Sequence, residues 1–483
     1  MGSSSSSIPT VQKTSIYSGV RLSFGSAPIR AEVPSSSPAT FSVQRSIPAS
    51  ASWLRIFPWE NPERPKQSKL APAAARDTAT LKTGGSINSS LSSALMGRGN
   101  GDRRGEVRNS DRHERLAFLL PSIPNVSNLK ISPNQAQVAI MATGLCGSDL
   151  HYYLHGRNGD FQLQAPLVLG HEASGVVTAV GAGVKGLKVG TRVAIEAGVF
   201  CNECSYCASG RVNLCKSMRF CSSAKTFPHL DGTLQTYMNH PAHLLHPLPQ
   251  ACSFDDGALA EPLSVLIHAA RRAQLSKGQS VLVFGVGAIG LLACSVAKSM
   301  GASRIVAVDI NQARLDFATS NGFAEATFCL PMGSKAKNPE EGLHCSQTGT
   351  ESVLRKFGQP DGFDVVFECT GAEPCIQMSV HAACVGGKVT LIGMGSRNVL
   401  LPISAAATRE VDLVGSFRYA HTYPEALELL SSGKLGAVHK LITHRFSLSE
   451  TQKAFELLSR GRDEDGRMVL KVIVGPDEAA TCQ

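Results

Sequence analysis

The sequence predicts an α/β fold in which a β-rich domain precedes a doubly wound parallel sheet. Two observations lead to this prediction. First, short apolar runs at 136–144, 174–181 and 191–198 are separated by Gly, Pro and Asn residues, which is typical of small strands in a barrel-like domain. Second, from about residue 263 buried strand patterns alternate with helix patterns, which indicates a parallel sheet covered by helices. A length of 483 residues allows two or three domains.

The positive charge of the chain is concentrated in its first part. Residues 1–115 contain 16 Lys and Arg against 8 Asp and Glu, whereas the remaining residues contain 31 against 30. The first part is also rich in Ser, Pro, Ala and Gly, so we interpret it as a disordered basic tail. The remainder is nearly neutral and predicts no nucleic-acid partner. No run of eighteen apolar residues predicts a membrane span.

The same tail leaves two locations open. Met1 is followed by GSSSSS and not by a signal-peptide pattern, so a reducing, cytoplasmic location is expected. Abundant Ser, scattered Arg and few acids also resemble a mitochondrial transit peptide, and a solvated tail is the alternative. In a reducing compartment the 14 cysteines favour metal binding over a disulfide scaffold.

The individual elements of the parallel sheet can be placed along the sequence. A helix is predicted at 288–301, where Gly301 ends it, and the segment 330–360 is interpreted as a loop-like insertion. The end of the chain, at 444–461, is predicted to form a strand and a helix. The expected strands are 280–285, 304–309, 363–369 and 387–393. The predicted domains are 116–262 for the β-rich domain, 263–417 for the parallel sheet, and 418–483 for a return to the first domain.

A cluster of four cysteines lies within sixteen residues of the β-rich domain. Thiolates this close in sequence can surround one Zn²⁺ with four sulfur ligands, which leaves no position for substrate or water. We therefore predict a structural zinc that stabilises a lobe. Free or paired thiols and a DNA-binding finger are the alternatives. The cysteines are Cys201, Cys204, Cys207 and Cys215.

A glycine-rich segment predicts a dinucleotide site. Gly285, Gly287 and Gly290 have GxGxxG spacing between a predicted strand and a predicted helix. The first glycine makes the turn, the second admits the pyrophosphate, and the third lets the helix pack close to the strand. Asp309 ends the next strand, where a carboxylate binds ribose hydroxyls and repels a 2′-phosphate, so NAD is favoured over NADP. Arg314 weakens this preference slightly, unless it is a surface helix residue.

A second set of metal-ligand residue types is dispersed along the chain. Cys146 lies in GLCGSDLHYY, His171 and Glu172 lie in LGHEASG, and Glu261 lies in ALAEPLSV. A single Cys or His is more often an ordinary core residue, but two Gly-flanked motifs favour a shared site. Mixed ligands that are far apart in sequence can leave a coordination position for water or substrate, as in catalytic zinc sites.

Together these motifs resemble the zinc-containing medium-chain dehydrogenases. The matching segments cover about 116–475, and they are CGSDLHYY, GHEASGVV, CNECSYCASGRVNLC, EPLSV, GVGAIG, ECTGAE and GSFRYAHTYPEAL. Within this family, Glu261 and the sequence Phe417–Arg418–Tyr419 are most similar to the polyol branch, which comprises sorbitol, xylitol and arabinitol dehydrogenases. The resemblance implies a GroES-like catalytic domain and a Rossmann nucleotide-binding domain.

The resemblance also implies roles for individual residues. Cys146 and His171 would bind a catalytic zinc, and Glu172 or Glu261 would complete the shell. Ser148 would hydrogen-bond the substrate hydroxyl, and His151 would pass its proton outward. The polyol pocket would be lined by Tyr152, Phe220, Arg418 and Tyr419, although Arg418 could instead form a structural ion pair. The coenzyme would contact Gly285, Gly287, Ile289, Gly290, Asp309, Arg314, Thr370 and Gly371.

The implied activity is the oxidation of a secondary alcohol of a polyol to a ketose, with NAD as the hydride acceptor, two zinc ions per chain, and a homotetramer. Two alternatives remain open. One is another zinc alcohol dehydrogenase, acting on threonine or a different secondary alcohol, and the other is a zinc-binding regulatory protein without activity. The sequence does not choose among polyols. The segment before Gln135 is shorter than the family pattern, so an altered barrel edge is expected.

Overall fold

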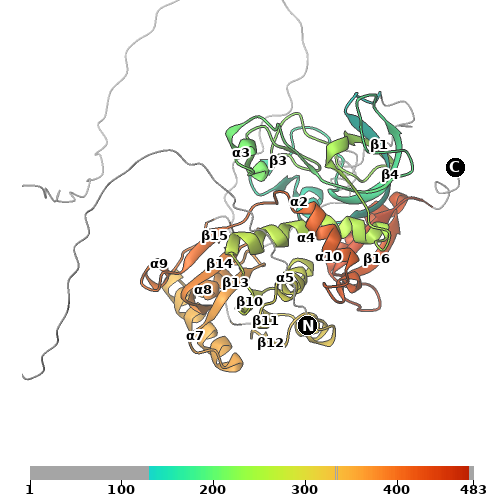
Figure 1. The fold of residues 1–483 in the computed structure, drawn as a ribbon. Coiled ribbons are helices and arrows are strands. Elements are labelled where there is room, and N and C mark those ends of the chain that lie inside the picture. Colours follow the sequence, from blue (N-terminus) through green and yellow to red (C-terminus); the bar gives the residue numbers. More distant parts are fainter. Residues whose placement is uncertain (1–129, 332, 334–335, 397, 478–483) are drawn as a thin grey trace, which may run out of the picture. The chain divides into compact units, whose positions relative to one another are not determined.

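The computed structural model describes residues 130–331, 333, 336–396 and 398–477. The predicted tail at 1–115, and the beginning of the first predicted domain at 116–129, lie outside the described residues. Within the described part, a β-rich domain and a parallel sheet with helices are joined by the long helix α4 (Phe254–Ala273) (Figure 1). The predicted α/β fold class is confirmed.

The β-rich domain is built on a seven-stranded sheet. The strand order is β16-β17-β1-β4-β5-β9, and β8 also pairs with β1. Buried and half-buried side chains alternate along most of β1, which therefore presents one face to the core. Strands β16 and β17 come from the end of the chain and form one edge of this sheet. The strands are β1 (Gln135–Gly144), β4 (Glu172–Val180), β5 (Arg192–Ile195), β8 (Tyr237–Pro241), β9 (Leu245–Pro247), β16 (Ile442–Ser447) and β17 (Lys471–Gly475).

Short elements between these strands carry several of the predicted site residues. Helix α2 begins after Cys146, whose backbone N–H donates to the Asp149 carboxylate at 3.2 Å, and ends at Gly156 in the left-handed conformation (φ +64°). The elements are α2 (Gly147–His155), β2 (Arg157–Asn158), β3 (Phe161–Gln162), β6 (Gly198–Val199), α3 (Ser205–Ala208), β7 (Arg219–Phe220), and the 3₁₀ turns η2 (Val212–Leu214) and η3 (Ala242–Leu244).

The second sheet is six-stranded and parallel, with the order β12-β11-β10-β13-β14-β15. The chain proceeds from β10 to β11 and β12 on one side, and then returns to β13 on the other side of β10. Ligands of such sheets bind at the carboxyl ends of the strands where this reversal occurs. The strands are β10 (Ser280–Phe284), β11 (Arg304–Asp309), β12 (Ala326–Cys329), β13 (Phe363–Glu368), β14 (Ala383–Leu391) and β15 (Asp412–Gly415).

The remaining helices cover this sheet or belong to the last part of the chain. They are α5 (Ala288–Ser299), α6 (Gln312–Ser320), α7 (Pro339–Phe357), α8 (Glu373–Ala382), α9 (Ile403–Ala407), α10 (Tyr423–Ser431), α11 (Thr451–Arg460), and the 3₁₀ turns η4 (Val438–Leu441) and η5 (Leu448–Glu450). One hydrophobic core extends from Val138 of β1 through Leu263 of α4 to Val283 of β10. The site residues are therefore held on elements that share a core.

Helix α4 connects the two domains and carries Glu261. The Ser253 hydroxyl caps its beginning by accepting from the Asp256 N–H at 3.1 Å. The helix contacts β4 and β5 of the first domain and α5 and β14 of the second. The predicted boundary after residue 262 falls within this helix, so the change of sequence pattern marks the middle of a helix and not a linker.

The prediction of a loop-like insertion at 330–360 is wrong. Helix α7 occupies most of this segment, and the Asn338 side chain caps it by accepting from the Glu341 N–H at 2.8 Å. Two of its buried positions, Ser346 and Thr350, are polar. Because polar residues occupy half of the buried face, the apolar repeat that identifies a helix in sequence is missing.

Candidate functional site

The antiparallel pairing of β1 and β4 brings two of the predicted metal-ligand motifs together. Gly144 at the end of β1 lies opposite Glu172 at the beginning of β4, and Cys146 follows two residues later. One ligand atom each from Cys146, His171 and Glu172 lies within 4.8 Å of the other two. A thiolate, an imidazole and a carboxylate at this spacing can together hold a zinc ion, and three protein ligands are the donor set of catalytic zinc sites.

Asp149 orients His171, and the sequence analysis did not select this residue. Its buried carboxylate lies 3.3 Å from Nδ1 of His171 and accepts from the Gly170 N–H at 3.2 Å and from the Ser222 hydroxyl. Burial alone would raise the pKa of Asp149, but His171 and these donors lower it. With Nδ1 engaged, Nε2 of His171 is left for a metal. The sequence signal that could have identified Asp149 is its place three residues after the candidate ligand Cys146.

Glu172 has a buried cationic partner that the sequence analysis also missed. Nζ of Lys471, on β17, donates to the two carboxylate oxygens of Glu172 at 2.6 and 2.9 Å and to the Leu145 carbonyl at 3.2 Å. The side chains are 5% and 1% exposed, so this ion pair is almost free of solvent. Lys471 therefore compensates the charge of a carboxylate that also faces Cys146 and His171.

Glu261 lies beside this group but is not one of its three members in the described part of the chain. Its side chain is buried on α4, and burial raises its pKa to about 7. His171 lowers the pKa and Glu172 raises it further, so both residues are electrostatic neighbours of Glu261. The geometry thus groups Glu172 with Cys146 and His171 and leaves Glu261 outside this group as an electrostatic neighbour.

Ser148 and His151 lie on helix α2, directly after Cys146. They are three residues apart and therefore share a face of the helix. Ser148 is half-buried and His151 is exposed, so the pair leads from the metal ligands toward solvent. Burial and the neighbouring His155, at 6.0 Å between ring centroids, lower the pKa of His151. No hydrogen bond joins Ser148 to His151 among the residues that the structure describes.

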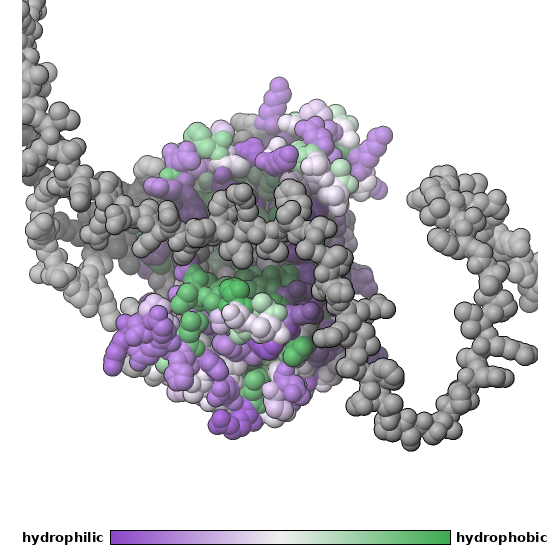
Figure 2. All heavy atoms as spheres, turned by 90° about the vertical axis from the view of Figure 1, so that its left-hand side faces the viewer, coloured by the Kyte–Doolittle hydropathy of each residue, from purple (hydrophilic) through white to green (hydrophobic). Residues whose placement is uncertain are grey.

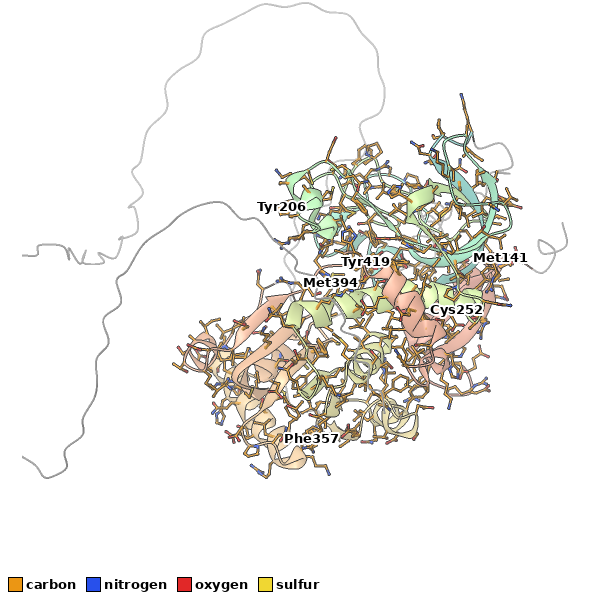
Figure 3. All side chains as sticks on the ribbon, in the orientation of Figure 1. Met141, Tyr206, Cys252, Phe357, Met394 and Tyr419 are labelled. Carbon is orange, nitrogen blue, oxygen red and sulfur yellow. The ribbon has the colours of Figure 1, made fainter. Side chains whose placement is uncertain are left out.

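Phe220, Arg418 and Tyr419 form a wall beside the metal ligands. The Phe220 ring lies 5.6 Å from the His171 ring, and the Arg418 guanidinium lies 3.8 Å from the Phe220 centroid. The Tyr419 ring is 6.3 Å from Phe220, and Figure 3 shows Tyr419 where α4 meets the β-rich domain. Nη1 of Arg418 and the hydroxyl of Tyr419 are buried and form no hydrogen bond with described residues. Such buried polar atoms call for a partner, which a hydroxyl-rich ligand can supply.

The surroundings of Arg418 define the rest of this wall. Its Nη2 donates to the Ser223 hydroxyl at 3.3 Å, and burial lowers its pKa to about 10. Across the described ranges Arg418 forms no ion pair, in contrast to the alternative of a structural ion pair. Tyr152 is buried, and its hydroxyl accepts from the Ala224 N–H at 3.0 Å. Tyr152 therefore supports the segment that holds Ser223, rather than offering a free hydroxyl.

The four clustered cysteines converge as the sequence predicts for a metal site. Their Sγ atoms lie within 4.8 Å of one another. The separations are 3.5 Å for Cys201–Cys215, 3.6 Å for Cys204–Cys207 and 3.9 Å for Cys201–Cys207. A tetrahedron of sulfur at ~2.3 Å from zinc has edges of about 3.8 Å, so the cluster fits one Zn²⁺ closely. No disulfide forms between these thiols, which excludes paired cysteines.

The glycine-rich loop lies at the carboxyl end of β10, where the strand order reverses. Gly285 has φ +85°, which favours glycine, and a Cβ on Gly290 would lie 1.7 Å from the Gly285 carbonyl oxygen. A Cβ on Gly287 would meet only Arg314 Nη1 at 4.0 Å, so this glycine faces open space. Ile289 lies in the first turn of α5, behind the loop. These positions match the expected roles of turn, open approach and close packing.

Asp309 and Arg314 flank the same loop. The Asp309 carboxylate accepts from the Val286 N–H at 2.8 Å and from the Asn311 N–H at 2.9 Å, which fixes it at the end of β11. The Arg314 side chain reaches the glycine loop near Gly287, and its Nε is buried without a hydrogen-bond partner among described residues. Arg314 is therefore not a plain surface residue.

Thr370 and Gly371 follow β13, the strand next to β10. Their backbone N–H groups donate to the fully buried Glu368 carboxylate at 2.8 and 2.9 Å. A Cβ on Gly285 would lie 2.6 Å from the Thr370 methyl group, so the two loops touch. Glu368, which sequence reasoning did not select, thereby shapes the second side of the crevice at the strand reversal.

Comparisons with known proteins place the chain in a family. Residues 132–250 match the alcohol dehydrogenase GroES-like domain, and residues 288–432 match the zinc-binding dehydrogenase domain. The chain therefore belongs to the zinc-binding dehydrogenases of the alcohol dehydrogenase type. This confirms the family and the two domain types that the sequence motifs indicated.

Three individual proteins illustrate the similarity. Sorbitol dehydrogenase of Gallus gallus is 42% identical over 339 residues, covering 70% of this chain and 90% of the relative. D-xylulose reductase A of Aspergillus niger is 40% identical, covering 72% and 92%. The solved structure of L-idonate 5-dehydrogenase from Escherichia coli is 30% identical, with a TM-score of 0.61, and the alignment covers 71% and 91% of the two chains. Among the described residues, no helix is long and apolar enough to cross a membrane.

Proposed function

We propose that this chain oxidises a secondary alcohol of a polyol to a ketose and transfers the hydride to NAD. One observation carries the proposal. Two polar atoms without partners, Arg418 Nη1 and the Tyr419 hydroxyl, are buried beside the Cys146–His171–Glu172 group. A ligand with several hydroxyls would satisfy them while one of its hydroxyls approaches the metal ligands. The names of the relatives refer to sorbitol, xylulose and idonate, which supports a hydroxyl-rich substrate.

The residues of the site divide the work. Cys146, His171 and Glu172 would hold the catalytic zinc, with Glu261 alongside, and a bound zinc supplies Lewis-acid stabilisation of an alkoxide. Ser148 would accept the proton of the substrate hydroxyl, and the exposed His151 would pass it to solvent.

Arg418 and Tyr419 would orient the remaining hydroxyls, since the guanidinium presents several fixed donors. Phe220 would exclude water from the reacting carbon, and Tyr152 would position the Ser223 segment. The closed four-cysteine site would hold a structural zinc and contact no substrate.

The coenzyme would lie across the crevice at the strand reversal. The pyrophosphate would approach Gly287 and the amino-terminal end of α5, beside Ile289. Asp309 would bind the ribose hydroxyls, and Arg314 would contact the phosphates from the other side. Thr370 and Gly371 would border the nicotinamide half. A fixed carboxylate at Asp309 repels a 2′-phosphate, which favours NAD over NADP.

A substrate panel tests the proposal. Full-length, zinc-loaded protein would be incubated with sorbitol, xylitol, L-arabinitol, threonine and 2,3-butanediol, each with NAD and with NADP. We expect NADH formation with at least one polyol, a higher kcat/KM for polyols than for threonine, and lower activity with NADP. Turnover of threonine or butanediol alone would favour the other branches of the family. No turnover of any alcohol would contradict enzymatic function and favour a binding protein.

We also propose a homotetramer, because an apolar surface lies at one edge of the parallel sheet. Figure 2 shows apolar side chains on the face that carries α9 and β15. The segment from β14 to α9 contains four large exposed apolar residues, Val385, Met394, Leu400 and Ile403, which are 74%, 61%, 45% and 57% exposed. Patches of this kind mark interaction surfaces. Light scattering coupled to size exclusion would measure the mass, and replacement of Leu400 and Ile403 by Asp should reduce it.

We propose a cytoplasmic location, with import into mitochondria through the tail at 1–115 as the alternative. The support is the set of free cysteines, which fits a reducing compartment. Fractionation of cells that express the full chain, compared with a chain lacking residues 1–115, distinguishes the two. A mitochondrial full chain and a cytoplasmic truncated chain would establish the alternative.

A further inference from the structure

Lys225 lies at the outer end of the pocket wall, and nothing in the proposed reaction uses it. The wall segment passes from Phe220 beside His171, through Ser223 beside Arg418, to the exposed Lys225. The Lys225 ammonium stands 4.9 Å from the centroid of the Phe417 ring and 6.0 Å from that of Phe161. Cation–π contact with two aromatic rings holds a side chain that would otherwise be free to move into solvent.

The charges around Lys225 are unbalanced. The backbone N–H of Lys225 donates to the Ser223 hydroxyl at 3.4 Å, whereas its ammonium forms no ion pair or hydrogen bond with any residue that the structure describes. The cationic Arg418 is an electrostatic neighbour of Lys225, and its guanidinium lies 4.8 Å from the centroid of the same Phe417 ring. Burial lowers the pKa of Lys225, and the positive charge of Arg418 lowers this pKa further. Among the described residues, the carboxylate that interacts with the charge of Arg418 is that of Glu261, which lies inward, next to the candidate metal ligands.

Two neighbouring cations that form no ion pair with described residues can together bind an anionic group. A neutral polyol can satisfy the unpartnered Nη1 of Arg418, but it leaves the Lys225 charge uncompensated. A carboxylate or a phosphate at the end of the polyol chain would satisfy both. The order of groups along the wall is metal ligands, hydroxyl-binding Arg418 and Tyr419, and then Lys225. This order places the anion at the far end from the oxidised carbon.

We propose that the site accepts a polyol that carries a terminal anionic group, a carboxylate or a phosphate, which Lys225 binds. The inference rests on the proposed polyol oxidation and specifies its substrate class. The reaction is unchanged: the carbinol C–H bond breaks, its hydride passes to NAD⁺, and the hydroxyl proton leaves to solvent. The products are a ketone, NADH and H⁺. The anionic group takes no part in the reaction and serves recognition.

The experiment compares matched substrate pairs with the full-length, zinc-loaded protein. L-Iditol is paired with L-idonate and D-sorbitol with D-gluconate, because each acid differs from its polyol only in one terminal carbon. D-Sorbitol 6-phosphate provides the phosphate probe. The measured quantity is the ratio of kcat/KM for the anionic substrate to that for its neutral partner. Lys225→Met removes the charge but keeps the stem, Lys225→Arg keeps the charge, and Lys188→Met alters an exposed lysine of the 181–190 loop.

In the wild type we expect this kcat/KM ratio to exceed one for a carboxylate probe or for the phosphate probe. The probe with the larger ratio identifies the preferred anionic group. Lys225→Met should lower that ratio about tenfold, mainly through the KM of the anionic substrate, since the lost contact is one partly exposed charge pair. Lys225→Arg and Lys188→Met should retain it. Added salt should lower the ratio in the wild type but not in Lys225→Met.

Two outcomes would overturn the inference. One is a wild type that oxidises neutral polyols but discriminates against every anionic probe. The other is a ratio that Lys225→Met leaves unchanged. Both leave the proposed polyol oxidation standing. Failure of all neutral and anionic polyols to give NADH would instead contradict the proposed function itself, so the two failures are distinguishable.

Discussion

Removal of the Lys471 charge should destabilise the protein by an amount that depends on metal. Lys471→Met keeps a long apolar side chain but leaves the Glu172 carboxylate without its cationic partner. The ammonium lies 2.6 and 2.9 Å from the two carboxylate oxygens, and neither side chain is more than 5% exposed. Removing one member of such a buried pair costs about 3–5 kcal/mol, because the remaining charge has no counter-ion. We expect this loss in the metal-free protein.

With zinc bound, the same substitution should cost distinctly less. The ion would face the Glu172 carboxylate and compensate its charge from the side of Cys146 and His171. Urea unfolding, followed by far-UV circular dichroism with and without a chelator, measures both differences from the wild type. The chelator removes zinc from both sites in every variant, so only differences between variants are compared.

The matched controls are Glu172→Gln and the double variant Glu172→Gln/Lys471→Met. The double variant has no buried charge at either position, so it should recover most of the stability that Lys471→Met loses. Equal losses for Lys471→Met with and without zinc would show that Glu172 does not face the metal. Additive losses in the double variant would refute the ion pair as the cause.

Three further predictions concern other parts of the site. Gly290→Ala should lower the melting temperature and should also weaken NAD binding more than tenfold. The reason is that the added Cβ would lie 1.7 Å from the Gly285 carbonyl oxygen. Gly287→Ala should lower NAD affinity alone, as calorimetry would show. Cys204→Ser should lose about one zinc per chain, measured by elemental analysis, and its main defect should be a lower melting temperature. Cys146→Ser should also lose about one zinc per chain, but its main defect should be loss of activity. Glu261 has a pKa raised from 4.5 to about 7, so the folded metal-free protein binds this proton more tightly than the unfolded chain. The free energy of unfolding of the metal-free wild type, relative to that of Glu261→Gln, should therefore fall by about 3 kcal/mol between pH 4.5 and 7 in urea titrations. A rise over this range would refute the raised pKa of Glu261.

Local motifs made much of the site predictable from sequence. The glycines at 285–290 predict a coenzyme loop because the three positions with distinct roles lie within six residues of the chain. The four cysteines predict a metal site because they also lie close together in the sequence. In contrast, Lys471 is a lysine within an ordinary strand, LKVIVG, and only the pairing of β17 with β1 places it beside Glu172. No local pattern in the sequence reports such a pairing.

Helix α7 and Asp149 were missed for different reasons. The buried face of α7 includes Ser346 and Thr350, so an apolar period was absent even though Asn338 and Pro339 gave a helix start signal. Asp149 has two tasks, as it accepts from the Cys146 N–H at the beginning of α2 and also orients His171. An acid at the start of a helix is already explained by helix capping. The sequence therefore gives no separate indication that Asp149 also orients His171.

The buried charges around Cys146, His171 and Glu172 favour the binding of a divalent cation at this candidate site. Three carboxylates are buried here, those of Asp149, Glu172 and Glu261, and two cations, Lys471 and Arg418, lie among them. A thiolate ligand from Cys146 would bring the negative charges to four. A divalent ion would then make the group neutral, whereas the protein's own cations leave it two charges short.

In the absence of metal, protons supply the missing charge. Burial raises the pKa of Glu261 to about 7. Burial lowers the pKa of His171, but Asp149 and Cys146 raise it well above its ordinary value. These two groups are therefore the ones that take up protons, and both lie next to the position where Cys146, His171 and Glu172 converge. Zinc binding should release protons from His171 and Glu261, so the affinity for zinc should rise with pH. Burial of Glu261 and the negative charge of Asp149 beside His171 thus raise the two pKa values at the place where the candidate metal ligands converge.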